Sequence, residues 1–376
     1  SKGVQFLMKK NKIEVIMGHG KIKAKGQVDV TNAEGKTTTY DCKHIIIATG
    51  GRARTLPNLP IDGKKVVGYR DAMVLPTQPK TMIVVGSGAI GVEFAYFYNS
   101  IGTKVTIVEF MPRIVPVEDE DISKELEKSF KKQGMEIMTN ASVESVDTSG
   151  AGVKAKVKTA SGEVILEADI ILSAVGVVSN MENLGIEALG IATDKGKIVV
   201  DGFGNTNIPG IYAIGDVSPG QALAHVASKE GIVCAENIAF LEKKHAHQPQ
   251  PIDYGNVPGC TYCSPEIASV GMTEKAAKEA GYELKIGKFP FVASGKATAA
   301  GSTEGFVKVI YDAKYGEWLG THMIGMNVTE MIAETVLGRK LETTYHEVLN
   351  SIHPHPTMSE AVKEATAMAF GEATDI

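Results

Sequence analysis

The sequence predicts an α/β protein in which parallel strands are followed by a C-terminal α+β region. Three apolar strands each run into glycines, at residues 44–51, 81–91 and 208–216, a pattern typical of parallel strands buried inside a sheet. Over the last ~125 residues the pattern changes to antiparallel-type strands and short helices. A chain of 376 residues is long enough for two or three domains.

The bulk composition is that of an ordinary globular protein. No stretch approaches the ~18 apolar residues of a transmembrane helix. The net charge of −5 gives no reason to expect binding to nucleic acid or to an anionic membrane surface. Ser1 to Met8 lacks the apolar core of a signal peptide, and four cysteines favour a reducing, cytoplasmic setting. Because the sequence starts at Ser1 without an initiator methionine, we expect a truncated or processed chain.

The first 55 residues read as short β-rich pieces. Candidate strands are Ile13 to Met17, Gln27 to Val30 and Thr37 to Tyr40, with a turn at Lys9 to Lys12. His44 to Ala48 reads as a buried parallel strand. Proline-rich connections then lead towards residue 79 and look like a linker.

The central segment has the order of a dinucleotide-binding βαβ unit: an apolar strand, a Gly-x-Gly-x-x-Gly turn, an apolar helix and a second strand. Gly86 permits the tight turn, Gly88 lets a pyrophosphate approach the backbone, and Gly91 lets helix and strand pack closely. The helix N-terminus offers free N–H groups to the phosphates. The alternative is a coincidental glycine turn.

An acid at the end of the second strand predicts which dinucleotide binds. Glu109 lies 23 residues after Gly86, where a carboxylate can accept hydrogen bonds from a ribose 2′-OH. The same carboxylate would repel a 2′-phosphate. The sequence therefore predicts NAD rather than NADP.

Further elements follow this unit. Asp121 to Lys132 has amphipathic helix spacing, and Ala224 opens another helix. Strand-like runs lie at residues 135–138, 153–158, 163–166, 267–271, 306–311 and 318–325, and a buried strand ends at residues 173–176. Later helices begin near Val328 and Thr344, and residues 358–368 carry an apolar stripe for core or subunit packing.

The order of these motifs resembles the flavoprotein pyridine nucleotide-disulfide oxidoreductases, and among them the dihydrolipoamide dehydrogenase (E3) family. The closing run from His353 to Glu360, His-Pro-His-Pro-Thr-Met-Ser-Glu, and the run Leu223 to Gly231 also match. The resemblance covers nearly the whole chain. Glutathione reductases are less similar because they prefer NADP, and mercuric reductases lack the terminal His-x-x-x-x-Glu pair.

The resemblance implies two dinucleotide-binding three-layer domains, of FAD and NAD type, the first of them incomplete, and a C-terminal α+β dimerisation domain. The implied domains are the remainder of the FAD-binding domain (1–78), the NAD-binding domain (79–199), an FAD-binding and central segment (200–252) and the dimerisation domain (253–376).

The resemblance also implies cofactor-binding residues. NAD would be surrounded by Gly86, Ser87, Gly88, Ala89, Ile90, Gly91, Glu93, Glu109, Val143 and Gly176. FAD would be contacted by Gly20, Thr49, Gly50, Gly51, Asp216, Ala222, Leu223, Ala224 and His225. Plainer alternatives are a turn-capping role for Asp216, a buried structural role for His225 and a helix-surface position for Glu93.

The best catalytic candidates are His355 and Glu360. A base must deprotonate a dithiol as it attacks a disulfide, and an imidazole whose other nitrogen contacts a carboxylate suits this task. The alternative is an ordinary loop histidine before a helix. His353 is interpreted as structural.

The resemblance implies two features that this sequence does not contain, an FAD-binding βαβ unit and a Cys-x-x-x-x-Cys redox pair. The cysteines are Cys42, Cys234, Cys260 and Cys263, and none has that spacing. Cys260 and Cys263 are interpreted as incidental thiols, with a labile disulfide or a metal site as alternatives. In addition, Val177 to Asn180 stands where many relatives carry Gly-Arg-x-Pro-Asn.

The function implied is oxidation of dihydrolipoamide by NAD+ through FAD and a redox disulfide, in a homodimer that serves 2-oxo-acid dehydrogenase complexes. Because the cysteine pair is missing, we expect this chain by itself to be inactive in the disulfide step and to hold FAD poorly. The alternatives are a non-catalytic NAD-binding and dimerisation fragment, and an NADH diaphorase.

Overall fold

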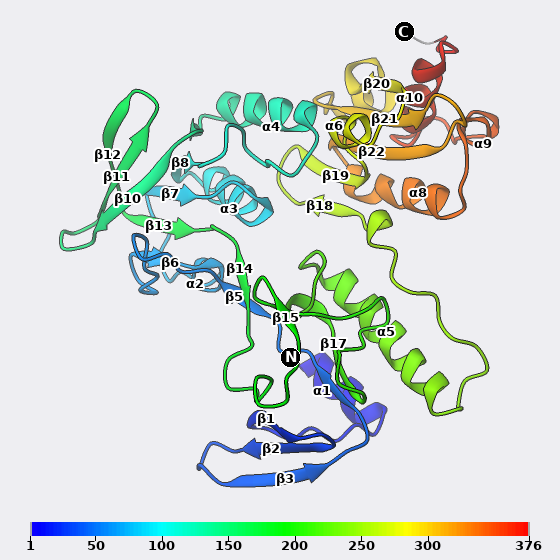
Figure 1. Ribbon diagram of the computed structural model, residues 1–376. Helices are drawn as coiled ribbons and strands as arrows, with labels where there is room; N and C mark the ends of the chain where they lie inside the picture. The colour runs from blue at the N-terminus through cyan, green and yellow to red at the C-terminus, as the bar shows by residue number, and fades with distance from the viewer. Residues whose placement is uncertain (1, 375–376) are drawn as a thin grey trace. The chain divides into compact units, whose positions relative to one another are not determined.

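A computed structural model describes residues 2–374 of the chain (Figure 1). Ser1 and residues 375–376, at the ends of two predicted domains, lie outside the described residues. The chain divides into two compact units: unit 1 comprises Ser1–Arg52 and Val177–Tyr254, and unit 2 comprises Ala53–Gly176 and Gly255–Ile376. Among the described helices, none is long and apolar enough to cross a membrane.

The first part of unit 2 is built on a five-stranded parallel sheet. Its order is β6-β13-β7-β8-β9, so β7 lies at the centre between β13 and β8. The strands are β6 (Val66–Val67), β7 (Thr81–Val85), β8 (Lys104–Val108), β9 (Glu136–Met138) and β13 (Ile170–Ser173). The helices are α2 (Tyr69–Ala72), α3 (Ala89–Ser100) and α4 (Glu120–Lys132). The strands and helices predicted here are confirmed.

A three-stranded antiparallel sheet is inserted between β9 and β13. It consists of β10 (Ser142–Asp147), β11 (Val153–Thr159) and β12 (Gly162–Ala168). Strand β10 was not predicted, because Glu144, Ser145 and Asp147 leave it with few apolar residues.

The C-terminal part of unit 2 is an antiparallel sheet covered by helices, as predicted. The sheet order is β18-β19-β22-β21-β20, and β21 and β22 are buried along their whole length. The strands are β18 (Gly259–Thr261), β19 (Glu266–Gly271), β20 (Leu284–Pro290), β21 (Phe306–Asp312) and β22 (Trp318–Gly325). The helices are α6 (Glu274–Glu279), α7 (Gly295–Ala300), α8 (Val328–Lys340), α9 (Tyr345–Asn350) and α10 (Glu360–Phe370), with short 3-10 turns at Tyr254–Asn256 and Phe291–Ala293.

The apolar stripe of α10 packs into this C-terminal core. Met358, Val362, Ala365 and Ala369 are buried in a cluster that includes Tyr311. Helix α10 lies directly on β20. The approach is so close that a Cβ at Gly287 of β20 would overlap the carbonyl oxygen of Ala365 in α10.

Unit 1 contains a short parallel pair, β4 (Ile45–Ile47) with β17 (Ile211–Ala213), and the antiparallel sheet β1-β2-β3. That sheet is formed by β1 (His19–Ala24), β2 (Gln27–Thr31) and β3 (Thr37–Asp41). The remaining elements are α1 (Lys2–Lys10), β5 (Gly51–Ala53), β14 (Val177–Ser179), β15 (Thr193–Asp194), β16 (Lys197–Ile198), the 3-10 turn Gly215–Val217 and α5 (Ala224–Leu241). Together with unit 2, these elements confirm the predicted fold class.

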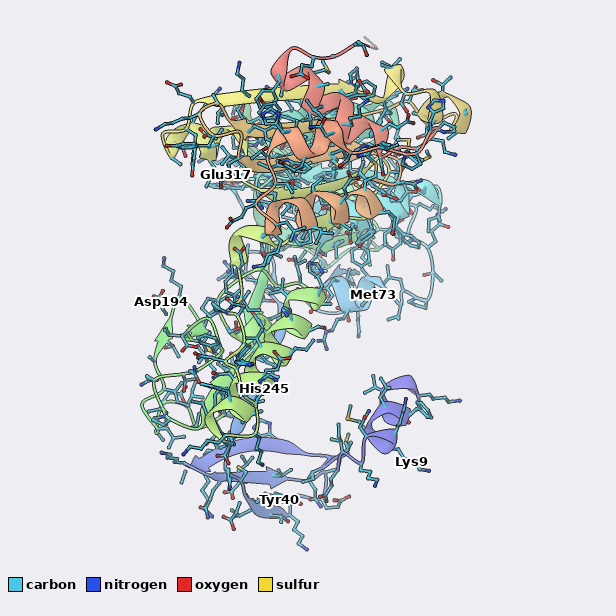
Figure 2. All side chains as sticks on the ribbon, turned by 90° about the vertical axis from the view of Figure 1, so that its right-hand side faces the viewer. Lys9, Tyr40, Met73, Asp194, His245 and Glu317 are labelled. Carbon is cyan, nitrogen blue, oxygen red and sulfur yellow. The ribbon has the colours of Figure 1, made fainter. Side chains whose placement is uncertain are left out.

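The N-terminal prediction was wrong at two places. Lys2–Lys10 forms helix α1 instead of β-rich structure, and it buries none of its residues, so that Lys9 and its neighbours project into solvent (Figure 2). Ile13 to Met17, expected to be a strand, is exposed and has no strand partner. Alternating apolar residues form a strand only where a neighbouring strand accepts their hydrogen bonds.

A buried ion cluster joins the two halves of unit 2. Lys308 of β21 places its Nζ 2.8 Å from Asp119 Oδ1, 3.0 Å from Asp121 Oδ2 and 2.7 Å from Glu274 Oε2. Asp119 caps α4, and its side chain and that of Lys308 are each 3% exposed. Although burial favours the neutral amine, the bonds to Asp119 and Glu274 raise the pKa of Lys308.

We expect Lys308→Met to lower the free energy of unfolding by about 3–5 kcal/mol, because Asp119 would remain buried without a counter-charge. Lys288→Met is the matched control. Lys288 is 45% exposed, lies 3.4 Å from Asp121 and should cost less than about 1 kcal/mol. Urea unfolding monitored by Trp318 fluorescence measures both, and equal losses would contradict a special role for the cluster.

Candidate functional site

The turn after β7 is formed by glycines that the backbone requires. Gly86 has φ +94°, a conformation that L side chains rarely adopt. A Cβ on Gly91 would overlap the carbonyl oxygen of Gly86, so only glycine lets α3 begin this close to the strand. Gly88 is the N-cap of α3 and has open space where a Cβ would lie. The turn therefore leaves room for a ligand at the helix N-terminus.

This turn lies in a cavity of about 630 Å³ at the carboxyl ends of β13, β7 and β8. Six of the residues predicted for NAD line it: Gly86, Ser87, Gly88, Glu109, Val143 and Gly176. Ala89, Ile90 and Gly91 form the first turn of α3 instead of the cavity wall. Arg54 and Asn58 also line the cavity, and sequence reasoning missed them because they lie just before and within the proline-rich linker, where there is no motif.

Glu109 is fixed by three hydrogen bonds. The backbone N–H and the hydroxyl of Ser87 donate to Oε2 at 2.8 and 2.6 Å, and the Met111 N–H donates to Oε1 at 2.7 Å. The side chain is buried, with Glu109 only 6% exposed. A carboxylate offers about four lone-pair directions, so one acceptor position remains for a ribose hydroxyl. The glycine cradle and this oriented acceptor fit a dinucleotide without a 2′-phosphate.

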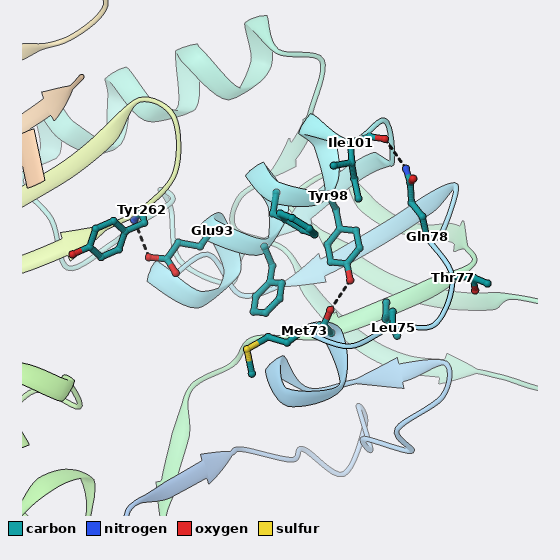
Figure 3. Close-up of a pocket in the computed structure, with 11 residues that line it drawn as sticks. Met73, Leu75, Thr77, Gln78, Glu93, Tyr98, Ile101 and Tyr262 are labelled. Atoms are coloured by element: carbon teal, nitrogen blue, oxygen red, sulfur yellow. Dashed lines mark hydrogen bonds between the residues drawn. The ribbon is translucent and has the colours of Figure 1, made fainter. Parts of the chain in front are cut away.

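Glu93 lies elsewhere. Its Oε1 accepts a hydrogen bond of 2.8 Å from the Tyr262 N–H, and it lines a second cavity of about 510 Å³ with Phe94 and Phe97 (Figure 3). Burial raises the pKa of Glu93, with the Tyr262 N–H acting in the opposite direction. The structure does not bring Glu93 into the cavity that holds the glycine turn.

In unit 1, residues predicted for FAD gather where two parallel strands end. Thr49, Gly50 and Gly51 follow β4, and Asp216 follows β17. A Cβ on Gly51 would lie 3.5 Å from a carboxylate oxygen of Asp216, so the two positions adjoin. Within residues 2–374 we find no hydrogen bond to the Asp216 carboxylate. It is an available acceptor for the hydroxyls of a ribitol chain, and the residues present fit a flavin dinucleotide.

The other predicted FAD residues occupy two further places in unit 1. Leu223 is the N-cap of α5, Ala224 and His225 form its first turn, and Ala222 precedes them. Gly20 lies in β1, where it pairs with Val30 of β2.

His355 and Glu360 are brought together as the spacing predicted. His355 Nδ1 lies 2.8 Å from Glu360 Oε1, and the Thr357 N–H donates to Oε2 at 2.7 Å. Burial opposes ionisation of Glu360, but the Thr357 N–H and His355 lower its pKa. The ionised carboxylate makes Nδ1 the protonated nitrogen. The His355 side chain is 80% exposed, and among the described residues no hydrogen bond involves its Nε2, so this nitrogen has a free lone pair.

His353 differs from His355 in its surroundings. Its Nε2 lies 2.7 Å from Glu334 Oε1, and its side chain is 8% exposed. The bond to Glu334 raises the pKa of His353, against the effect of burial. The mostly buried ring and its bond to the partly exposed Glu334 support a structural role.

The four cysteines are unpaired in the structure. Cys263 is buried and donates to the Pro265 carbonyl, and burial raises its pKa, as it does for Cys260. In residues 2–374 no group of three His, Cys, Asp or Glu side chains is placed to hold a metal ion. A thiol with a raised pKa is a poor nucleophile at neutral pH.

Comparison with known proteins gives consistent matches. Residues 1–231 match the family described as pyridine nucleotide-disulphide oxidoreductase, and residues 257–366 match its dimerisation domain. The chain is 49% identical to a dihydrolipoyl dehydrogenase of Rhizobium etli, over 98% of this chain and 79% of the relative. It is 47% identical to a dihydrolipoyl dehydrogenase of Zymomonas mobilis, over 99% and 79%.

A solved structure is similar as well. LpdA from Mycobacterium tuberculosis superposes with a TM-score of 0.88 at 28% identity, over 97% of this chain and 79% of the other.

Two glycine variants separate binding from folding. Gly88→Ala should weaken NADH binding at least about tenfold, because its methyl group enters the open space beside the helix N-terminus. It should change stability by less than about 1 kcal/mol. Gly91→Ala should destabilise by ~3 kcal/mol through overlap with Gly86. NADH fluorescence titration and thermal unfolding measure these effects, and unaltered NADH affinity in Gly88→Ala would refute the assignment of the cavity.

Proposed function

Since this chain belongs to the pyridine nucleotide-disulphide oxidoreductase family, whose dihydrolipoyl dehydrogenases use FAD and NAD, we propose that it works as a dihydrolipoyl dehydrogenase. The reaction oxidises the dithiol of dihydrolipoamide to a disulfide and reduces NAD+ to NADH with release of a proton. The observation that carries this proposal is the His355–Glu360 pair. Dinucleotide binding alone needs no such base, whereas thiol–disulfide chemistry does.

The role of His355 follows from its hydrogen bond. Glu360 accepts the Nδ1–H, so Nε2 is the nitrogen that takes a thiol proton as the sulfur attacks. The positive charge that develops on the ring is stabilised by the Glu360 carboxylate, which the Thr357 N–H holds in place. The exposure of the ring lets a substrate from outside the chain's own core reach it.

For the NAD half of the reaction, the residues of the cavity would bind the dinucleotide and orient it. The N-terminus of α3 and the glycine turn would hold the pyrophosphate, with Ser87, Ala89, Ile90 and Gly91 contributing backbone. Glu109 would accept a hydrogen bond from the adenosine ribose. Val143 and Gly176 would line the two ends of the site. Glu93 would contact NAD only if its carboxylate gave up the hydrogen bond from the Tyr262 N–H and bonded to the ligand instead.

In unit 1, Asp216 would bind the ribitol, Thr49, Gly50 and Gly51 the adenosine half, and Ala222 to His225 the ring, with Gly20 nearby. When bound, FAD supplies the carrier that passes two electrons from the dithiol–disulfide pair to NAD+. We assign residues 1–78 and 200–252 mainly to FAD binding, 79–199 to NAD binding and 253–376 to dimerisation, with Arg54 and Asn58 of the first segment lining the NAD cavity.

The dimerisation domain supports a homodimer. By the family pattern, His355 would act across the dimer on a redox disulfide, a cysteine pair that these 376 residues do not themselves contain. The proposed physiological partners are the lipoyl groups of 2-oxo-acid dehydrogenase complexes. We place the protein in a reducing compartment, the cytoplasm, because its four cysteines are unpaired.

One observation favours a second candidate function. The 376 residues contain no Cys-x-x-x-x-Cys pair, so the disulfide step needs sulfur atoms that these residues do not supply. A chain limited to them would be a non-catalytic NAD-binding and dimerisation protein. If it retained flavin, it would act as an NADH diaphorase, which needs no cysteine pair.

The visible absorption spectrum of the purified protein tests these candidates first. A stoichiometric flavin band near roughly 450 nm, with NAD-dependent oxidation of dihydrolipoamide, is expected for the dehydrogenase. Flavin with dye reduction but no lipoamide activity would instead identify the diaphorase. A colourless protein that binds NADH would identify the non-catalytic candidate.

In flavin-containing protein, His355→Gln should lower the dihydrolipoamide rate by about 10²–10⁴-fold and leave reduction of a dye by NADH near the parent value, because only the thiol step uses the base. Glu360→Gln should give a smaller loss of the same kind, since the ring loses its charged acceptor.

His346→Gln, which changes an exposed histidine of α9, is the control and should be neutral. A loss of dye reduction equal to the loss of lipoamide activity in His355→Gln would argue for general misfolding and against the base.

A further inference from the structure

The cavity that holds the glycine turn has one feature that the proposed function does not use, the side chain of Arg54. Among the side chains that line this cavity in the described part of the chain, Arg54 is the one cation and Glu109 the one acid. The backbone N–H of Arg54 donates to the carbonyl oxygen of Gly176 at 3.0 Å. A Cβ on Gly176 would lie 4.0 Å from Arg54 Nε, so the guanidinium end of the side chain passes beside this glycine.

The guanidinium of Arg54 has no counter-ion in the described part of the chain. Within residues 2–374, no carboxylate lies within ion-pair distance of it and no side-chain hydrogen bond involves it. Arg52, two residues earlier, is paired by contrast: its two terminal nitrogens lie 3.1 and 2.6 Å from the carboxylate oxygens of Glu182. A guanidinium presents a planar fork of donors that suits carboxylates and phosphates. Arg54 therefore has its full donor capacity available to a ligand.

The sheet order fixes where this cation lies relative to Glu109. Strand β7 leads to Gly86 and Gly88 at the centre. Strand β8 leads to Glu109 on one side, and β13 leads on the other side to Gly176, beside which Arg54 lies. The cavity thus has an acceptor at one side, a helix N-terminus in the middle and a free cation at the other side.

We propose that Arg54 binds the phosphate on the nicotinamide side of the NAD pyrophosphate and so is a binding residue of this site. The proposal rests on the proposed binding of NAD in this cavity. With the adenosine ribose at Glu109 and the pyrophosphate over Gly86 and Gly88, the nicotinamide half extends towards Gly176. The second phosphate then lies on the side of Arg54. The segment that follows Gly176, Val177 to Asn180, contains no cation of its own.

The position also explains why this arginine does not favour NADP. A 2′-phosphate would lie on the adenosine ribose, next to the buried carboxylate of Glu109. Arg54 is hydrogen-bonded to Gly176 beyond the end of β13, on the far side of β7 from that carboxylate, and so is not placed beside a 2′-phosphate there. Arg54 therefore adds affinity for the pyrophosphate and leaves the choice between NAD and NADP to Glu109.

Three ligands and three variants test the assignment in the full chain. NADH is titrated by fluorescence, and ADP-ribose and AMP are measured by competition. ADP-ribose retains both phosphates, whereas AMP retains only the phosphate on the adenosine side. The variants are Arg54→Gln, Arg54→Lys and the control Arg70→Gln, which removes the same charge from an exposed position on α2.

Arg54→Gln should weaken NADH and ADP-ribose about tenfold and leave AMP within about twofold, because one charge-assisted contact to the second phosphate is lost. Arg54→Lys should recover part of the affinity, since it keeps the charge but not the fork. Arg70→Gln should bind all three ligands like the parent. Thermal unfolding of each variant confirms that it is folded.

The outcomes separate this proposal from the proposed function. If the parent chain does not bind NADH, the NAD site fails and Arg54 fails with it. If the parent binds NADH and Arg54→Gln binds it equally well, only the role of Arg54 is refuted. An equal loss for AMP would also refute it, because the side chain would then act on the adenosine side or on the shape of the loop.

Discussion

The dinucleotide cavity depends on one close approach, that of Gly91 in α3 to the carbonyl oxygen of Gly86 at the end of β7. No side chain fits between them, so the helix begins immediately at the strand end and its N-terminus faces the cavity. This contact places Ser87 where its N–H and hydroxyl reach Glu109 from the neighbouring strand. Turn, helix dipole and oriented carboxylate are thus consequences of the same contact.

Much of this arrangement could be predicted because its signals are local. Glycine spacing, strand hydrophobicity and the His355–Glu360 separation all act within about twenty residues. Long-range features left no such signal: the approach of Arg54 to Gly176 and the contact of Glu93 with Tyr262 join segments more than 100 residues apart. Helix α1 was missed for a different reason: it is only nine residues long, has no acidic residue in its first turn and buries none of its side chains, so neither a capping signal nor a core contact marks it.

The two histidines of the closing segment show how burial divides roles between similar residues. Both pair with a glutamate at 2.7–2.8 Å. His353 is almost fully buried, and its pair contributes to packing, whereas His355 keeps one ring nitrogen in contact with solvent. From the sequence, only the spacing to Glu360 distinguished a catalytic His355 from a structural His353. The different exposure of the two rings gives this distinction a physical basis.

The ion cluster around Lys308 has a consequence for how such proteins can be recombined. Its ammonium belongs to the antiparallel sheet, while Asp119 and Asp121 belong to the helix that follows β8. A chimaera that took its dimerisation region from a relative would inherit one half of the cluster without the other unless both sides were exchanged together. The domain boundary near residue 253 is therefore a boundary in sequence but a poor place for a crossover.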